Sequence, residues 1–135
     1  MYRSILVAVA PDHPETVPLM LKAARALCAP GGTIGALTVL EQVPAYVAPY
    51  MPEGQEVETR TALEAQLAVE LADAPDVART VLRGHAGNTI LEHAATIGAE
   101  CIILASHRPE LSDYFLGSTA ARVVRHAPCS VHVIR

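Results

Sequence analysis

The residues best placed for chemistry lie between positions 105 and 119, in the stretch ASHRPELSDYFLGST. It ends in Gly117–Thr119, where a helix is predicted to begin, and the backbone N–H groups and dipole of a helix start favour an anion. The glycine lets a phosphate approach the backbone, and the serine and threonine add hydroxyl donors. His107 and Arg108 would supply positive charge. The stretch predicts a phosphate-binding loop or, alternatively, a surface connection in which Ser118 only caps the helix.

Alternating apolar runs and amphipathic segments must position this loop. Apolar runs rich in β-branched residues read as buried strands, and apolar residues at helical spacing mark the segments between them. Pro30-Gly31-Gly32 is expected to end the first helix. Strict alternation favours a parallel sheet with helices on both faces and right-handed crossovers. The expected strands are 4–10, 33–40, 77–82, 101–106 and 130–135, and the expected helices are 17–28, 56–73, 89–97 and 118–126.

Ligands of such sheets bind at the carboxyl ends of the strands, where the strand order reverses. This rule selects three strand ends, at residues 9–12, 39–43 and 104–108. The segment after the second strand, EQVPAYVAPYMPEGQ, contains three prolines and no period. It is expected to be a long irregular loop, either a lid over the site or a surface for a partner.

Composition excludes several classes of protein. The chain has 135 residues, 51% hydrophobic, which fits one domain with a single core. The net charge is −4, and the densest basic run, 122–126, is too short for nucleic-acid binding. No apolar run approaches the roughly 18 residues of a membrane span, and no signal peptide is recognised, so a cytoplasmic location is expected. The three separated cysteines are expected to be buried, reduced thiols.

No motif indicates a metal centre or dedicated catalysis. The six histidines include no pair at i, i+4 spacing and no cysteine partner nearby, so no metal ligands are expected. There is no Gly-x-Ser-x-Gly elbow and no Walker loop, so no catalytic residues are assigned.

Four blocks of the sequence are recognisable: ILVAV, NTILEHA, CIILASHRP and LGSTAARVVRHAPCSVHVIR. Through them the whole chain resembles the universal stress protein family, and the last block is the most specific. The resemblance implies one α/β domain over residues 1–135, a three-layer sandwich with a five-stranded parallel sheet of order 3-2-1-4-5. It also implies a homodimer through the last strand, Ser130–Arg135. Many members bind ATP, and members with a degraded loop do not.

The family's nucleotide loop has the form Gly-x-x-Gly, nine residues, then Gly-Ser/Thr, and this chain matches it in part. The first two glycines fall on Ala105 and Arg108, while Gly117 and Ser118 are kept. Eight residues, one fewer than the pattern, separate Arg108 from Gly117. The arginine side chain would either block the phosphates or clamp them, since a guanidinium suits bidentate phosphate contact.

The acidic residue that ends the family's first strand falls on Ala10, with Asp12 two residues further on. The resemblance implies ATP as the ligand, with any Mg²⁺ on its phosphates. Residues expected to contact it are Ala8, Val9, Ala10, Val39, Leu104, Ala105, Ser106, His107, Arg108, Gly117, Ser118 and Thr119.

The expected function is binding of an adenine nucleotide without efficient turnover, with signalling or protection through contacts to a protein partner that the sequence does not name. Two alternatives remain open. One is a dimeric interaction module of the same fold that binds no nucleotide. The other is slow ATP hydrolysis or autophosphorylation at Ser118.

Overall fold

The fold is that of a computed structural model, which describes residues 1–106 and 116–135. Strands and helices alternate along the chain, as the sequence predicts. Two short 3₁₀ turns, η1 (Pro14–Thr16) and η2 (Ala48–Tyr50), lie in the connections. The main elements are β1 (Tyr2–Ala8), α1 (Val17–Leu27), β2 (Cys28–Glu41), α2 (Gln55–Glu70), β3 (Ala78–Gly84), α3 (Ala86–Ile97), β4 (Cys101–Ala105), α4 (Ser118–His126) and β5 (Ser130–Ile134).

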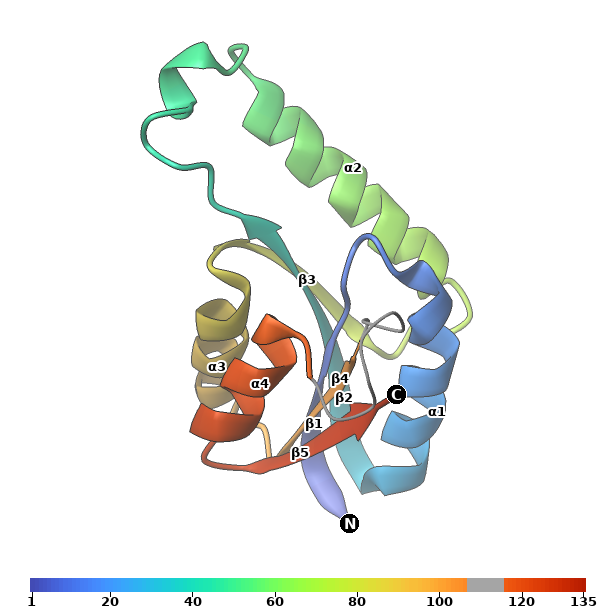
Figure 1. The fold of residues 1–135 in the computed structure, drawn as a ribbon. Coiled ribbons are helices and arrows are strands. Elements are labelled where there is room, and N and C mark those ends of the chain that lie inside the picture. Colours follow the sequence, from blue (N-terminus) through green and yellow to red (C-terminus); the bar gives the residue numbers. More distant parts are fainter. Residues whose placement is uncertain (107–115) are drawn as a thin grey trace.

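The five strands form one parallel sheet in the order β3-β2-β1-β4-β5. This confirms the order implied by the family resemblance. Helices α1 and α2 cover one face of the sheet, and α3 and α4 cover the other (Figure 1). The strand order reverses between β1 and β4, so their carboxyl ends open a crevice at one edge of the sheet.

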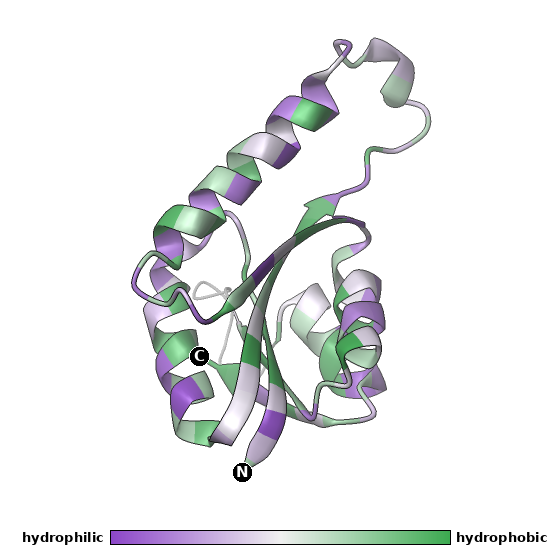
Figure 2. Cartoon of the chain, turned by 180° about the vertical axis from the view of Figure 1, so that it is seen from behind, coloured by the Kyte–Doolittle hydropathy of each residue, from purple (hydrophilic) through white to green (hydrophobic). Residues whose placement is uncertain are grey.

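Two apolar layers hold the sandwich together, one on each face of the sheet. Successive side chains of a strand point to opposite faces, so Ile5 and Val7 pack under α1 and α2 while Leu6 packs under α3 and α4. All three side chains are fully buried. Figure 2 shows the resulting green band along the inner strands. Because helices cover both faces of the sheet, the buried part of β1 consists of consecutive apolar residues.

The start of β2 differs from the sequence prediction. Pro30-Gly31-Gly32 was expected to end the helix and the strand to begin at Thr33, but β2 already begins at Cys28, directly after α1. Cys28 pairs with Tyr2, yet the next pair is Thr33 with Ser4, so β2 bulges between these two pairs. Gly31 has a φ of 78°, which permits this bulge. The Pro-Gly-Gly segment therefore bends a strand rather than separating two elements.

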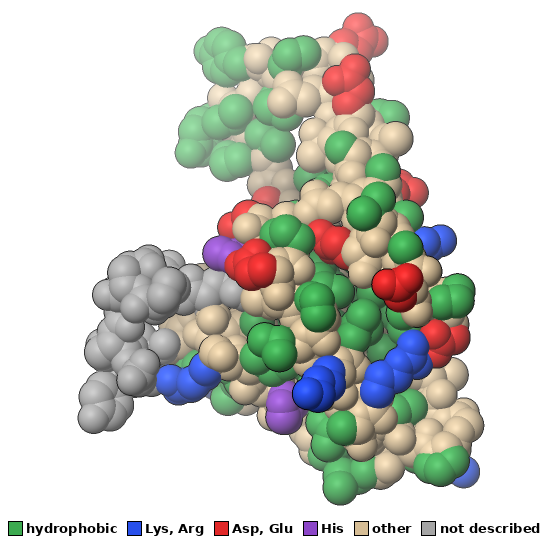
Figure 3. Space-filling view, turned by 90° about the vertical axis from the view of Figure 1, so that its right-hand side faces the viewer, with side chains coloured by type: hydrophobic (Ala, Val, Ile, Leu, Met, Phe, Trp, Pro, Cys, Tyr) green, Lys and Arg blue, Asp and Glu red, His purple; other side chains and the backbone are tan. Residues whose placement is uncertain are grey.

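The segment 42–54, called the arm below, leaves the carboxyl end of β2 and returns to the start of α2. Apart from η2 it is irregular, as its prolines predict. It projects beyond the sheet (Figure 1), and apolar side chains gather at its outer end (Figure 3). Tyr46 and Tyr50 are 79% and 86% exposed. No helix within residues 1–106 and 116–135 is long and apolar enough to cross a membrane.

Candidate functional site

A cavity of about 590 Å³ opens at the carboxyl ends of β1, β2 and β4, beside the first turn of α4. Its position agrees with the rule that ligands bind where the strand order reverses. The described residues that line it are Ala8, Val9, Ala10, Pro11, Asp12, His13, Leu37, Val39, Glu41, Ala86, Ile90, Leu104, Ala105, Gly117, Ser118, Thr119 and Ala120.

Most of the residues selected from the sequence meet in this cavity. Ala8, Val9, Ala10, Val39, Leu104, Ala105, Gly117, Ser118 and Thr119 all line it. Ser106 was also selected but is not among the lining residues. Its backbone N–H donates to the Ile134 carbonyl at 2.8 Å, so Ser106 extends the pairing of β4 with β5. His107 and Arg108 lie outside the described residues.

The apolar wall of the cavity is fixed by hydrogen bonds between the ends of β1 and β2. The Val9 N–H donates to the Leu37 carbonyl at 2.8 Å. The Thr38 hydroxyl, 2% exposed, donates to the Val9 carbonyl at 3.3 Å. Leu37 and Val39 point to the same face, and both are buried. A flat apolar group such as a purine base would meet a rigid surface here.

The polar end of the cavity is the first turn of α4. Gly117, not Ser118, is the N-cap residue, with φ −62° and ψ 159°, and its carbonyl accepts the Ala121 N–H at 2.8 Å. No side chain caps the helix. Ser118 is therefore not the N-cap residue that the alternative prediction expected. Its hydroxyl and the first N–H groups of the helix remain available to an anion.

Open space lies beside this helix start. A Cβ added to Gly117 would meet no atom of residues 1–106 and 116–135 within 4 Å, so these residues leave the backbone open to close approach. Ser118 is exposed, and Thr119 is half-buried. The Gly-Ser-Thr end of the loop thus presents an exposed hydroxyl and an open helix start to the cavity.

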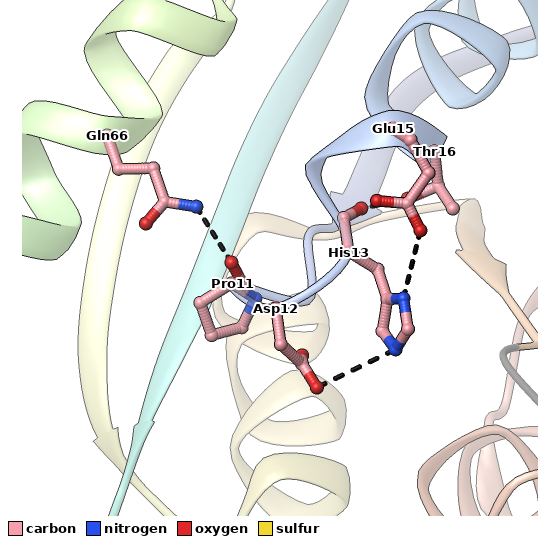
Figure 4. Close-up of polar contacts among 6 residues, drawn as sticks. All are labelled: Pro11, Asp12, His13, Glu15, Thr16 and Gln66. Atoms are coloured by element: carbon pink, nitrogen blue, oxygen red, sulfur yellow. Dashed lines mark hydrogen bonds and ion pairs between the residues drawn. The ribbon is translucent and has the colours of Figure 1, made fainter.

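The segment after β1 contributes a group of polar residues that the sequence reading mentioned only through Asp12. His13 Nδ1 lies 2.9 Å from Glu15 Oε1, and its Nε2 lies 3.6 Å from Asp12 Oδ2 (Figure 4). The Thr16 hydroxyl donates to the His13 carbonyl at 2.8 Å, and Gln66 of α2 donates to the Pro11 carbonyl at 2.7 Å. These bonds hold Asp12 and His13 at the mouth of the cavity.

Two other contributions to the cavity lining were not selected as site residues from the sequence. Glu41 is the last residue of β2, within the strand end that the sequence selected, but it was not named as a site residue. Ala86 and Ile90 belong to α3, which begins three residues earlier than predicted. His85 caps this helix by accepting the Asn88 N–H on its ring at 3.3 Å. Histidine is an uncommon cap, so no sequence signal marked the start.

Within the described residues, no group of three or more His, Cys, Asp and Glu side chains could hold a metal ion. The carboxylates nearest the cavity are Asp12 and Glu41, which come from different strand ends. A divalent cation at this cavity would have to be held mainly by a ligand's phosphates, as Mg²⁺ commonly is.

The fold and the cavity define a doubly wound α/β protein with a small-molecule site at its strand-order reversal. The model of the universal stress protein family matches residues 1–135, and this chain belongs to that family. It is 31% identical to universal stress protein A homolog 2 of Coxiella burnetii, over 99% of this chain and 95% of that protein. With universal stress protein G of Shigella flexneri it is 36% identical over 52 residues, 38% of this chain and 37% of that protein.

Solved structures of the family share the fold. Universal stress protein UspA from Lactobacillus plantarum superposes with a TM-score of 0.70 at 26% identity, covering 99% of this chain and 98% of that one. Two further structures contain adenine nucleotides. One is a universal stress protein in complex with cAMP, with TM-score 0.67, 13% identity and coverage of 99% and 97%. The other, from Archaeoglobus fulgidus in complex with dAMP, has TM-score 0.62, 21% identity and coverage of 99% and 98%.

Proposed function

We propose that this protein binds an adenine nucleotide, with ATP as the leading candidate, in the cavity between β1, β2, β4 and α4. The observation that carries the proposal is that residues selected from separate strand ends and from the start of α4 line one cavity. Its volume of about 590 Å³ lies in the range of small-molecule sites, roughly 300–1,000 Å³. Membership of a family in which two structural neighbours contain cAMP and dAMP adds support.

The chemistry of the walls suits the two ends of such a ligand. Leu37 and Val39 offer an apolar surface to the base, and the α4 start offers N–H groups and the Ser118 hydroxyl to a phosphate. Asp12 is a hydrogen-bond acceptor for ribose hydroxyls at the cavity mouth, where the family's acidic residue is replaced by Ala10.

We also propose that turnover is inefficient. Phosphoryl transfer is accelerated mainly by positive charge that stabilises the transition state. Among the described residues, the lining of this cavity includes no lysine and no arginine, so no cationic side chain of the cavity lies at the α4 start, where the first phosphate would bind. Slow hydrolysis or phosphorylation of Ser118 is the competing candidate, and the exposed hydroxyl that caps no helix favours it. Incubation with γ-labelled ATP separates the two, because label in free phosphate or in the protein would support the competing candidate.

Binding is tested by thermal unfolding of the purified protein with ATP, AMP or cAMP, with and without Mg²⁺. Ligand at a hundredfold over its dissociation constant should add about 2.7 kcal/mol to the free energy of unfolding. Ala10→Trp fills the cavity and should abolish the ligand-induced shift. Ala26→Trp, at an exposed position of α1 outside the lining, should retain it. No shift with any nucleotide at millimolar concentration would contradict the proposal and favour a non-nucleotide interaction module.

We propose that the protein forms a homodimer through β5. This strand lies at the edge of the sheet and pairs only with β4 in the described chain, so its outer edge is open to a second copy. Sedimentation equilibrium should show a dimer. Ser130 and Ile134 bond to the β4 side, so the backbone N–H of Val133 points to the outer edge of β5, and Val133→Pro should remove an edge donor and shift the mass toward the monomer. A wild-type monomer at micromolar concentration would contradict this proposal.

A reducing compartment, the cytoplasm, is the proposed location. All three cysteines are free, and burial raises the pKa of the Cys101 and Cys129 thiols, which keeps them in the unreactive protonated form.

A further inference from the structure

A second cavity of about 360 Å³ adjoins the nucleotide cavity on the side of α3 and α4. The two cavities share Glu41, Ala86, Ser118 and Thr119, so they are continuous across the first turn of α4. The second cavity extends from that turn along α4 and is closed on the other side by His85 and Ala86 at the start of α3, which lies beside α4 in Figure 1.

The walls of the second cavity are basic. Arg122, Arg125, His85 and His126 line it, and Glu41 is the one acidic side chain among its described lining residues. Arg122 and Arg125 lie three residues apart on α4, so one face of the helix presents both guanidinium groups together. The two arginines in one cavity stand out in a chain whose net charge is −4.

Arg122 is held in place by its neighbours. Its Nε donates to Asn88 Oδ1 at 2.5 Å. Its aliphatic stem lies against Gly87, where an added Cβ would come within 2.9 Å of Arg122 Cδ. The bond to Asn88 uses one of the five guanidinium N–H donors, and four remain for a ligand. A guanidinium fixed in this way loses little freedom when it binds a phosphate.

The other basic groups are also available. Arg125 forms no hydrogen bond or ion pair within residues 1–106 and 116–135. His85 accepts the Asn88 N–H on Nδ1, so the proton of its neutral ring lies on Nε2, which is a donor. Several other arginines of the chain are occupied, as Arg25 is by Asp76 and Arg83 by Glu56.

We propose that this second cavity is an anion subsite that receives a second phosphate of the bound nucleotide. The identity of the ligand rests on the proposed function, but the subsite itself rests on the basic groove. The first phosphate would lie at the α4 start, and the second would pass Thr119 to reach Arg122 and Arg125. The preferred ligand is therefore an adenine nucleotide with two phosphate groups, either in one chain or on two positions of the ribose.

The test compares AMP with ADP, ATP and adenosine 3′,5′-bisphosphate by isothermal titration calorimetry. In the wild type, at least one nucleotide with two or more phosphates should bind more tightly than AMP. The identity of that nucleotide shows which path the second phosphate takes. Arg125→Ala should weaken that ligand about tenfold, the loss of one charge-assisted hydrogen bond, and change AMP less than about twofold. Arg79→Ala, which removes an exposed arginine of β3 outside both cavities, is the control and should change neither.

A substitution at Glu41 should have the opposite effect on affinity to Arg125→Ala. Its carboxylate lines both cavities and repels an anion, so Glu41→Gln should tighten binding of inorganic pyrophosphate. Equal effects of Arg125→Ala on AMP and on the longer nucleotides, or no effect on either, would overturn the subsite.

Inorganic pyrophosphate separates failure of the subsite from failure of the proposed function. If no adenine nucleotide binds, the proposed function fails, and the subsite is then judged by NMR titration with pyrophosphate alone. Saturable shifts of the Arg122 Nε and His85 ring signals that are lost in Arg125→Glu would support it. Weak, unsaturable shifts spread over the surface would overturn it.

Discussion

Arg25 of α1 and Asp76 of the turn before β3 form a two-pronged ion pair, with Nη1 to Oδ2 at 2.5 Å and Nη2 to Oδ1 at 2.8 Å. The pair connects two segments on the same face of the sheet. The hydrogen bond from Arg25 lowers the pKa of Asp76 from 3.8 to about 2. Both side chains are substantially exposed, so the pair makes a small contribution to stability.

The pH dependence of this contribution has a definite sign. The folded-state pKa of Asp76 is depressed, so the stabilisation is present above about pH 4 and is lost as the pH falls toward 2. Asp76→Asn should lower the free energy of unfolding at pH 7, and the difference from the wild type should shrink as the pH falls from 4 toward 2. Urea unfolding between pH 2 and pH 7 measures this. A difference as large at pH 2 as at pH 7 would mean that the ion pair is not its source.

Gly84 should not tolerate a side chain. Its φ is 152°, and an added Cβ would lie 2.5 Å from the Thr89 hydroxyl oxygen. Gly84→Ala should therefore cost about 1–3 kcal/mol in the free energy of unfolding. In the double variant with Thr89→Ala, part of this cost should be recovered, because the contact is removed while the backbone strain stays. Additive effects of the two substitutions would exclude the contact.

Only the C-terminal part of α2 should contribute to the stability of the fold. Leu67 is 2% exposed and packs on the sheet, whereas Val57, ten residues earlier, is 68% exposed. Leu67→Ala should cost about 2–5 kcal/mol, and Val57→Ala, the matched control, less than about 0.5 kcal/mol. Denaturant unfolding measures both. A large cost at Val57 would reveal that its surface is covered in solution.

Ser118 should contribute to binding and not to folding. Gly117 is the N-cap, and no side chain caps α4, so Ser118→Ala should change the free energy of unfolding by less than about 0.5 kcal/mol. The same variant should weaken the nucleotide about tenfold by removing a hydrogen bond to a phosphate. Loss of about 1 kcal/mol of stability without loss of affinity would instead indicate a capping role.

The fold could be predicted from the sequence because most of its helices and strands are marked by the hydrophobic pattern of their own residues. β4 is wholly apolar over Cys101–Ala105, and α4 has the bounds expected from its apolar spacing and Pro128. The predicted start of β2 was wrong because Pro30 and the glycines after it are turn residues in most settings. Here the neighbouring strand β1 imposes a bulge that uses them.

The site could be predicted in part. The strand-end rule and the family loop located Val9, Val39 and Gly117, which lie on different elements and meet in one cavity. Ile90 was missed because its contribution depends on how α3 packs across the sheet. Arg122 and Arg125 belong to the basic run that is too short to bind a nucleic acid. Their helical spacing was visible in the sequence, but the groove beside α3 was not.

The backbone of the arm should tolerate cleavage or insertion without loss of the fold. Residues 42–54 contribute nothing to the buried core. The strand before the arm, β2, pairs with β3, which follows α2, from Gly35 to Glu41. A protease cut or an inserted reporter peptide at the arm would leave the sheet's hydrogen bonds in place. The two fragments, 1–46 and 47–135, would therefore be candidates for complementation, with reassembly of the sheet as the signal.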